Sequence, residues 1–143
     1  MPTAPGELIR AWFEEVWNQG KEEAVDRFLS PDFLSCGLPT EDRQPVRGPE
    51  GFKLLYRRLR GAFPDIKVEL VHVLAEGDMA AAHCHLKGTH TGDTLGVPAT
   101  GKTVDFRGVV LVKTRGDKII EGHNYFDFLG MFHQIGLLPP MRI

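Results

Sequence analysis

Apolar residues in the first 63 positions recur three and four residues apart, the spacing that predicts amphipathic helices. Three segments have this pattern: residues 6–20, 21–29 and 48–63. Gly20 provides a stop for the first, and Pro49 suits the first helical position of the third. The N-terminal part of the chain is therefore predicted to be helical.

From residue 66 onward the apolar period changes to two, which is typical of half-buried strands. Four runs separated by turn signals alternate in this way: 66–75, 79–90, 103–114 and 118–126. Even-numbered residues are expected to face the core in every run, among them His72, Leu74, His90, Ile120 and Asn124. Helices followed by an antiparallel meander with one covered face predict an α+β roll, formed as a single domain over residues 1–143.

The last predicted hairpin has two possible registers. A two-residue Gly116-Asp117 loop would pair Val110 with His123 and turn the wrong face inward. A three-residue loop, or one bulge, would pair Val110 with Asn124 and keep both apolar faces on one side. Because a slip of one residue flips every side chain, the second register is predicted, and Asn124 is expected to point inward.

Composition narrows the classes of function. The net charge is −2 with both signs interspersed, whereas a nucleic-acid surface needs a concentrated basic stripe. Cys36 and Cys84 match neither a disulfide framework nor a zinc pattern, so both are expected to be reduced thiols in a cytoplasmic protein. No apolar run approaches the ~20 residues of a membrane span, and "MPTAPGELIR" lacks the features of a signal peptide. Neither a nucleic acid nor a membrane is expected as a partner.

Several stretches resemble the SnoaL-like polyketide (ester) cyclases. The longest are "GTHTGDTLGVPATGK" (88–102) and "RGVVLVKTRGDKIIEGHNYFDFLGMFHQIGL" (107–137), and "FPDIKVE", "AEGDMAA" and "WNQG...VDRFLSPDF" are also similar. The resemblance implies the cone-shaped fold of the nuclear-transport-factor-two-like superfamily, in which a curved sheet wraps round about three N-terminal helices and encloses a pocket. It also implies chemistry without a cofactor.

In the polyketide-cyclising members, an aspartate on the last strand removes a proton from a carbon between carbonyls, and a histidine on the preceding strand assists the aldol closure. The resemblance places the aspartate at Asn124 and the histidine at Val110. A primary amide has no usable basicity near neutral pH, so Asn124 is not expected to act as the base.

Four residues are candidates for chemistry, and each also has a structural interpretation. Asn124 could stabilise an enolate through its NH₂ group, or it could be a buried amide bonded to the backbone. His90 could be an acid or base, or its ring could order the following loop. His72 could carry a proton or be a core residue, and Asp127 could be a carboxylate at the pocket rim or a helix cap.

Substrate contacts are expected from seven residues: Ser35, Trp17, Phe63, Cys84, Phe106, Val110 and Phe126. Residues 91–102 contain three glycines but no phosphate-binding motif, and they are interpreted as a flap beside the pocket mouth.

The outward face of the sheet is expected to carry His83, His85, His123 and Tyr125, together with Val109 and Leu111. Such a mixture of aromatic, imidazole and aliphatic groups predicts a homodimer through this face. A metal site is not expected there, because His123 would lie two strands and about 10 Å away from the other two imidazoles.

Two functional hypotheses follow. The first is a cofactor-free enzyme that acts on a small apolar or polyketide-like carbonyl compound by enolisation and then ring closure, isomerisation or hydration. Asn124 would orient or stabilise oxygen in that enzyme, and His90, His72 or Asp127 would carry the proton. The alternative is a non-catalytic small-molecule-binding module that uses the same cavity.

Overall fold

The computed structural model describes residues 3–40 and 42–139. Helix α1 continues into a π-helical turn, Phe13–Asn18, and a 3₁₀ turn, Glu22–Ala24, leads into α2. The elements within the described residues are α1 Pro5–Trp12, α2 Val25–Phe28, β1 Leu29–Cys36, β2 Val46–Arg47, α3 Gly48–Ala62, β3 Lys67–Glu76, β4 Met79–Thr89, β5 Thr103–Arg115, β6 Lys118–Phe126 and α4 Phe128–Gln134.

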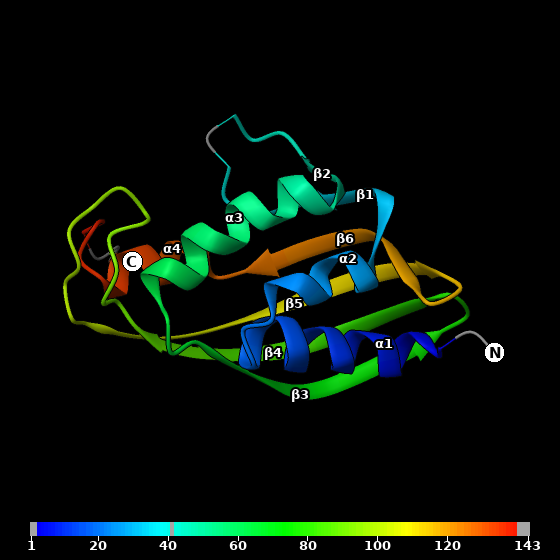
Figure 1. The fold of residues 1–143 in the computed structure, drawn as a ribbon. Helices are drawn as coiled ribbons and strands as arrows, with labels where there is room; N and C mark the ends of the chain where they lie inside the picture. Colours follow the sequence, from blue (N-terminus) through cyan, green and yellow to red (C-terminus); the bar gives the residue numbers. More distant parts are fainter. Residues whose placement is uncertain (1–2, 41, 140–143) are drawn as a thin grey trace.

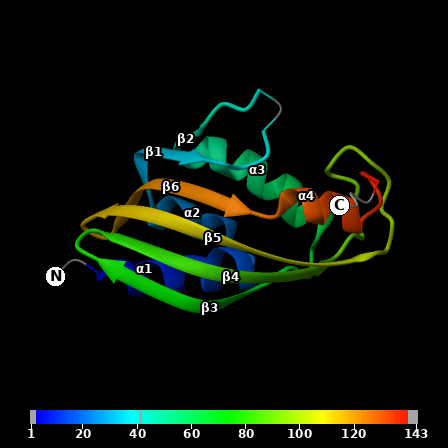
Figure 2. The ribbon, with the colours of Figure 1, turned by 180° about the vertical axis from the view of Figure 1, so that it is seen from behind.

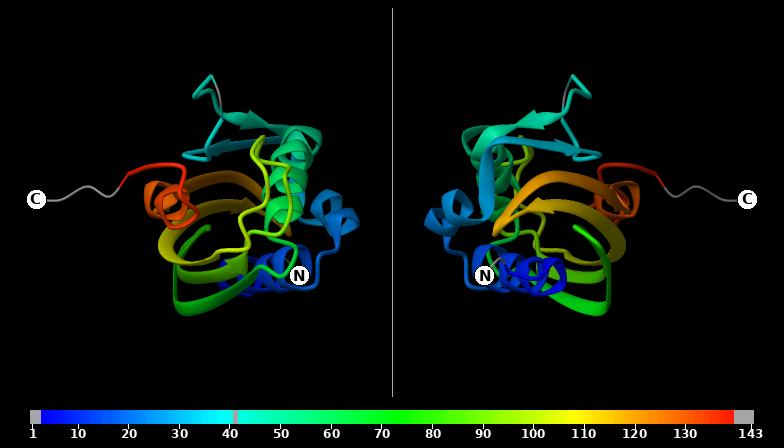
Figure 3. Two further views of the ribbon diagram at one scale, coloured as in Figure 1. Left: turned by 90° about the vertical axis from the view of Figure 1, so that its left-hand side faces the viewer. Right: turned by 90° about the vertical axis from the view of Figure 1, so that its right-hand side faces the viewer.

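The strands form one sheet in the order β2-β1-β6-β5-β4-β3. Strand β1 runs parallel to β6, and every other pair of neighbours is antiparallel. Helices α1, α2 and α3 lie on one face of the sheet (Figure 1), and in Figure 2 the opposite face is in front, with these helices behind the strands. The sheet curves round the helices when it is viewed from the end (Figure 3). The predicted α+β roll is therefore confirmed.

Aromatic side chains hold the helices to one another. The ring of Trp12 packs against those of Phe28 and Phe52, with centroid separations of 5.9 and 5.0 Å. The buried hydroxyl of Tyr56 donates a hydrogen bond of 2.8 Å to the backbone carbonyl of Val16. These contacts connect α1 to α2 and α3, so the helical layer is one packed unit that faces the sheet.

The β5–β6 pairing confirms the predicted register, because Val110 lies opposite Asn124. The pairing shifts between Lys113 and Thr114, where Ile120 is the extra residue of a bulge on β6. Beyond the bulge the alternation is reversed. Ile119 therefore takes the buried position, and the inward orientation predicted for Ile120 is wrong.

A second bulge reverses the alternation in β3. Leu70 pairs with Cys84, but the next pair is His72 with His83, so Val71 is the extra residue. The side chains of His72 and Leu74 consequently lie on the outer face of the sheet and are exposed. The inward orientation predicted for both is wrong because a bulge exchanges the two faces of a strand.

Strand β1 is not predicted by the sequence pattern, because Pro31 and Asp32 interrupt its alternation. Its C-terminal end approaches β6 closely, and a Cβ atom on Gly37 would lie 2.0 Å from the backbone oxygen of Asn124. Gly37 also has a φ of +84°, a backbone conformation that favours glycine. This glycine lets β1 bring Ser35 beside β6.

The longest helix of the described residues is α3, with 15 residues. Within the part of the chain that the structure describes, none of the helices has the length and apolar character required to cross a membrane.

Candidate functional site

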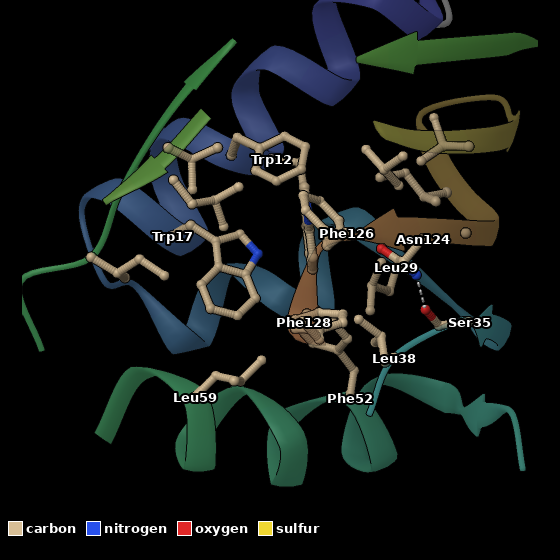
Figure 4. Close-up of a pocket in the computed structure, with 18 of the residues that line it drawn as sticks. Trp12, Trp17, Leu29, Ser35, Leu38, Phe52, Leu59, Asn124, Phe126 and Phe128 are labelled. Carbon is tan, nitrogen blue, oxygen red and sulfur yellow. Dashed lines mark hydrogen bonds between the residues drawn. The ribbon is translucent and has the colours of Figure 1, made fainter. Parts of the chain in front are cut away.

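A cavity lies between the helical layer and the inner face of the sheet. The cavity and its open mouth together enclose about 770 Å³ that no protein atom occupies. Only about 70 Å³ of this space is wide enough to hold the centre of a water molecule. Its walls are mostly aromatic and aliphatic, and Figure 4 shows Trp12 and Trp17 on one side and Phe126, Phe128 and Leu38 on another. Because the interior is narrow and apolar, a ligand must be small or flat and largely uncharged.

The lining contains no titratable side chain among the described residues: no Asp, Glu, His, Lys, Arg, Cys or Tyr contributes to it. Apart from the indole N–H groups of Trp12 and Trp17, the hydrogen-bonding side chains of the lining are Ser35 and Asn124. General-base catalysis needs a side chain that can accept a proton near the operating pH. The cavity wall offers no such group.

Asn124 and Ser35 form the polar end of the cavity (Figure 4). The Asn124 Nδ2 group donates to Ser35 Oγ at 2.9 Å and to the backbone carbonyl of Cys36 at 2.8 Å. Both hydrogens of the NH₂ group are therefore used within the protein, which agrees with the structural interpretation of Asn124. The carboxamide oxygen points toward the cavity in Figure 4.

His90 lies outside the cavity lining and is fully buried. Its Nδ1 accepts the backbone N–H of Thr100 at 3.2 Å and lies 2.9 Å from the Thr100 hydroxyl. The His90 backbone also exchanges 2.8 Å hydrogen bonds with Lys102 and Gly101. Because Nδ1 accepts from a backbone N–H, the ring carries its hydrogen on Nε2, which has no partner among the described residues. The ring therefore binds Thr100 of the following loop, which agrees with its structural interpretation.

The other two candidate proton carriers are also outside the lining. His72 is exposed on the outer face, where its Nδ1 lies 3.2 Å from Nδ1 of His83 and the two rings stack. Asp127 caps α4, because its carboxylate accepts the backbone N–H of Gly130 at 2.8 Å. The cap interpretation of Asp127 agrees with this geometry.

Of the seven predicted contact residues, the cavity lining includes Ser35, Trp17, Phe63, Phe106, Val110 and Phe126. Cys84 is the exception. It is fully buried, its Sγ lies 3.6 Å from the carbonyl of Ala82, and burial raises the pKa of its thiol to about 12. The thiol is therefore a protonated core group rather than a nucleophile.

Other lining residues come from elements that the sequence pattern does not predict as part of a pocket. Leu29 and Phe33 lie on β1, Leu38 follows it, and Phe128 and Met131 lie on α4. The sequence signals for α4 are its capping residue, Asp127, and the helical spacing of the apolar residues Phe128, Met131 and Ile135. Both elements are brought to the cavity by pairing or packing against β5 and β6.

Residues 91–102 pack against the C-terminal end of α3. The backbone N–H groups of Thr91 and Gly92 donate to the carbonyl of Ala62, and the Thr94 hydroxyl donates to the carbonyl of Arg58 at 2.6 Å. None of the residues in this loop contributes to the described cavity lining. The loop is therefore held against the end of α3, and its interpretation as a flap beside the pocket mouth stays a prediction.

The outer face of the sheet carries the predicted imidazoles. His83, His85 and His123 are half-buried, and Tyr125 is 71% exposed. Within the described residues, no three His, Cys, Asp or Glu side chains converge as metal ligands would. His85 instead bonds to Asp105, and that hydrogen bond lowers the pKa of the Asp105 carboxyl.

Comparison with known proteins agrees with this architecture. Residues 7–135 match the SnoaL-like polyketide cyclase family. The chain is similar to aklanonic acid methyl ester cyclase DnrD of Streptomyces peucetius, with 30% identity over 91% of this chain and 89% of the relative. It is also similar to nogalonic acid methyl ester cyclase of Streptomyces nogalater, with 28% identity over 84% and 89% of the two chains.

Two solved structures extend the comparison to three dimensions. A protein from Jannaschia sp. CCS1 assigned as a SnoaL-like polyketide cyclase has a TM-score of 0.82 and 27% identity, over 98% of this chain and 99% of that one. TsrD from Streptomyces laurentii has a TM-score of 0.77 and 25% identity, over 92% and 94% of the two chains.

Proposed function

Because the chain belongs to the SnoaL-like polyketide cyclase family, we propose that it binds a neutral polyketide-like carbonyl compound in this cavity and promotes its intramolecular ring closure without a cofactor. The observation that carries the proposal is the lining itself. It is apolar and confining, and one polar pair, Ser35 and Asn124, lies at one end.

Aldol ring closure is an isomerisation, so the protein need not take up a proton overall. The π electrons of an enol form the new bond to the carbonyl carbon, and the carbonyl π electrons move to its oxygen. The enol O–H loses its proton, and the new alkoxide oxygen gains one. A cavity without a basic side chain can promote this reaction on a substrate that enolises readily.

Confinement and a hydrogen bond supply the catalysis in this proposal. Holding the two reacting carbons in contact removes conformational entropy that the substrate would otherwise lose on the way to the transition state. This lowers the activation free energy by up to several kcal/mol. The Ser35 hydroxyl accepts from Asn124, and no acceptor for its own hydrogen is found among the described residues. That hydrogen is free to donate to the carbonyl oxygen where negative charge develops.

The test is incubation with the substrates named for the relatives, aklanonic acid methyl ester and nogalonic acid methyl ester, followed by chromatography and mass spectrometry. A product of unchanged mass and altered retention, formed faster than without protein, supports ring closure. Ser35→Ala is expected to slow it, whereas Asp127→Asn, which keeps a capping side chain on α4, is expected to leave the rate unchanged.

The lack of a titratable lining residue also supports a second candidate, a non-catalytic binding module for the same class of ligand. Native mass spectrometry separates the two. A ligand that is retained with one-to-one stoichiometry and recovered unchanged supports the binding module.

A further inference from the structure

The orientation of the Asn124 side chain is fixed by its neighbours. Its nitrogen lies 2.8 Å from the backbone carbonyl oxygen of Cys36, which can only accept a hydrogen bond. Exchanging the amide oxygen and nitrogen would place two acceptors against each other at that distance. The nitrogen must therefore face β1, and the oxygen must face away from it.

The amide oxygen is consequently an acceptor presented to the cavity. Within the described residues, Asn124 Oδ1 receives no hydrogen bond, and Asn124 belongs to the cavity lining. In Figure 4 this oxygen lies on the side of the amide away from Ser35, toward Phe126. The nearest polar neighbour, Ser35, is already bonded to the nitrogen of the same amide.

An acceptor in an apolar cavity discriminates among ligands by their polar groups. A hydroxyl hydrogen satisfies it, whereas an ether or keto oxygen at the same place would bring two acceptors together and leave both without a donor. A carboxylate would be worse still, because no cation lines the described cavity and a desolvated charge needs a partner.

We propose that the polar end of this cavity is a hydroxyl-binding subsite, in which Asn124 Oδ1 accepts the O–H of a neutral enol or phenol. The Ser35 hydroxyl donates a hydrogen bond to an adjacent carbonyl oxygen of the ligand. The preferred ligand class is an enolised 1,3-dicarbonyl or a hydroxyaryl ketone, and the diketo tautomer, the ether and the anion are disfavoured. This inference rests on the proposed function only in taking the cavity as the ligand site.

Calorimetric titration with small flat probes tests the subsite without any substrate. The probes are 2-naphthol, which donates an O–H, 2-methoxynaphthalene, which cannot donate, and 2-naphthoate, which is an anion. Wild-type protein is expected to bind 2-naphthol about 3- to 10-fold more tightly than the ether, the range that one net hydrogen bond corresponds to. Binding of 2-naphthoate is expected to be weaker than that of either neutral probe.

Two variants test whether the preference for 2-naphthol over the ether depends on Asn124. Asn124→Leu removes the acceptor, so its affinity ratio between 2-naphthol and the ether is expected to fall to about one. Cys84→Ala changes a buried residue outside the lining, and it is expected to keep the wild-type ratio. The comparison of the three probes with wild-type protein needs no variant. It therefore tests the hydroxyl-binding subsite even if Asn124→Leu does not fold.

Equal wild-type affinities for 2-naphthol and the ether, or tighter binding of the anion, would overturn the subsite. Failure of all three probes to bind would overturn it as well. Selective binding without turnover would retain the subsite and remove ring closure, whereas turnover with no selectivity would do the reverse, so the two proposals fail separately.

Discussion

Val110 on β5 and Asn124 on β6 are direct cross-strand partners, and both side chains line the cavity. The family resemblance assigns these two positions to the assisting histidine and the base of the polyketide-cyclising members. In this chain they form an aliphatic and amide pair at the same place. On that assignment, neutral side chains stand at both proton-transfer positions of this chain.

Asn124→Asp is expected to introduce a base. The new carboxyl would sit in a largely apolar cavity with one oxygen facing the Cys36 carbonyl, and both desolvation and that carbonyl raise its pKa above the ordinary value. The turnover rate of a carbon-acid substrate should therefore rise with pH as the carboxyl ionises, which rate measurements from pH 5 to 8 would detect. Asp127→Asn, at the cap of α4, is the control and should not change the profile. A turnover rate of Asn124→Asp that does not change between pH 5 and 8 would contradict the placement of this side chain in the cavity.

Gly37→Ala is expected to be strongly destabilising, by several kcal/mol, because its Cβ would lie 2.0 Å from the Asn124 backbone oxygen at a positive φ. Gly96→Ala is the matched control. Its φ is also positive, at +87°, but no heavy atom lies within 4 Å of a Cβ there, so about 1–2 kcal/mol of strain is expected. Urea unfolding of both variants measures the difference. Equal losses would show that β1 does not approach β6 as described.

Much of the fold can be predicted from the sequence, because the even-numbered apolar residues of β4 and β5 define one face without ambiguity. The bulges at Val71 and Ile120 cannot, since each lies beside apolar residues of both parities, such as Val73 with Leu74 and Ile119 with Ile120. Either phase of alternation fits those stretches, and only the packing of the finished sheet selects one.

The candidate site could likewise be predicted only in part from the sequence. The position of Asn124 follows from the hairpin register and the resemblance, but the direction of its amide depends on Ser35 and Cys36, about 90 residues earlier. The parallel β1–β6 pairing that brings them together is non-local and leaves no periodic signal in the chain.

Asp65 is expected to stabilise the fold by binding Thr89, the last residue of β4. Its carboxylate accepts the backbone N–H of Thr89 at 2.7 Å and the Thr89 hydroxyl at 2.8 Å, and the backbone hydrogen bond is the largest cause of its lowered pKa. Because the folded pKa is below the unfolded one, this stability is present above the unfolded value and is lost as pH falls through the folded value. Asp65→Asn should cost about 1 kcal/mol or less at pH 7, and the difference from wild type should shrink below about pH 4.

Urea unfolding at pH 7 and pH 3 checks that expectation. Asp117→Asn, in the β5–β6 turn, is the control, because no hydrogen bond to its carboxylate is found among the described residues. A difference between Asp65→Asn and wild type that stays constant with pH would contradict the role of Asp65.

Leu111→Glu is expected to dissociate a homodimer formed through the outer sheet face. Around Leu111 this face exposes Val109 by 40%, Tyr125 by 71% and Leu74 by 73%, an apolar composition that interface centres favour. Light scattering at micromolar concentration measures the mass. Leu54→Glu, at an exposed position on α3, is the control and should remain dimeric. A monomeric wild-type protein would refute the interface.

The central claim is that this cavity promotes ring closure without a titratable side chain, and the pH dependence of wild-type turnover tests it most directly. With a substrate that stays neutral throughout, the maximal rate is predicted to be flat from pH 5 to 8, and to remain flat in His90→Ala and His72→Ala. A rate that rises through a single ionisation near pH 6 to 7, and loses that ionisation in either histidine variant, would contradict the account.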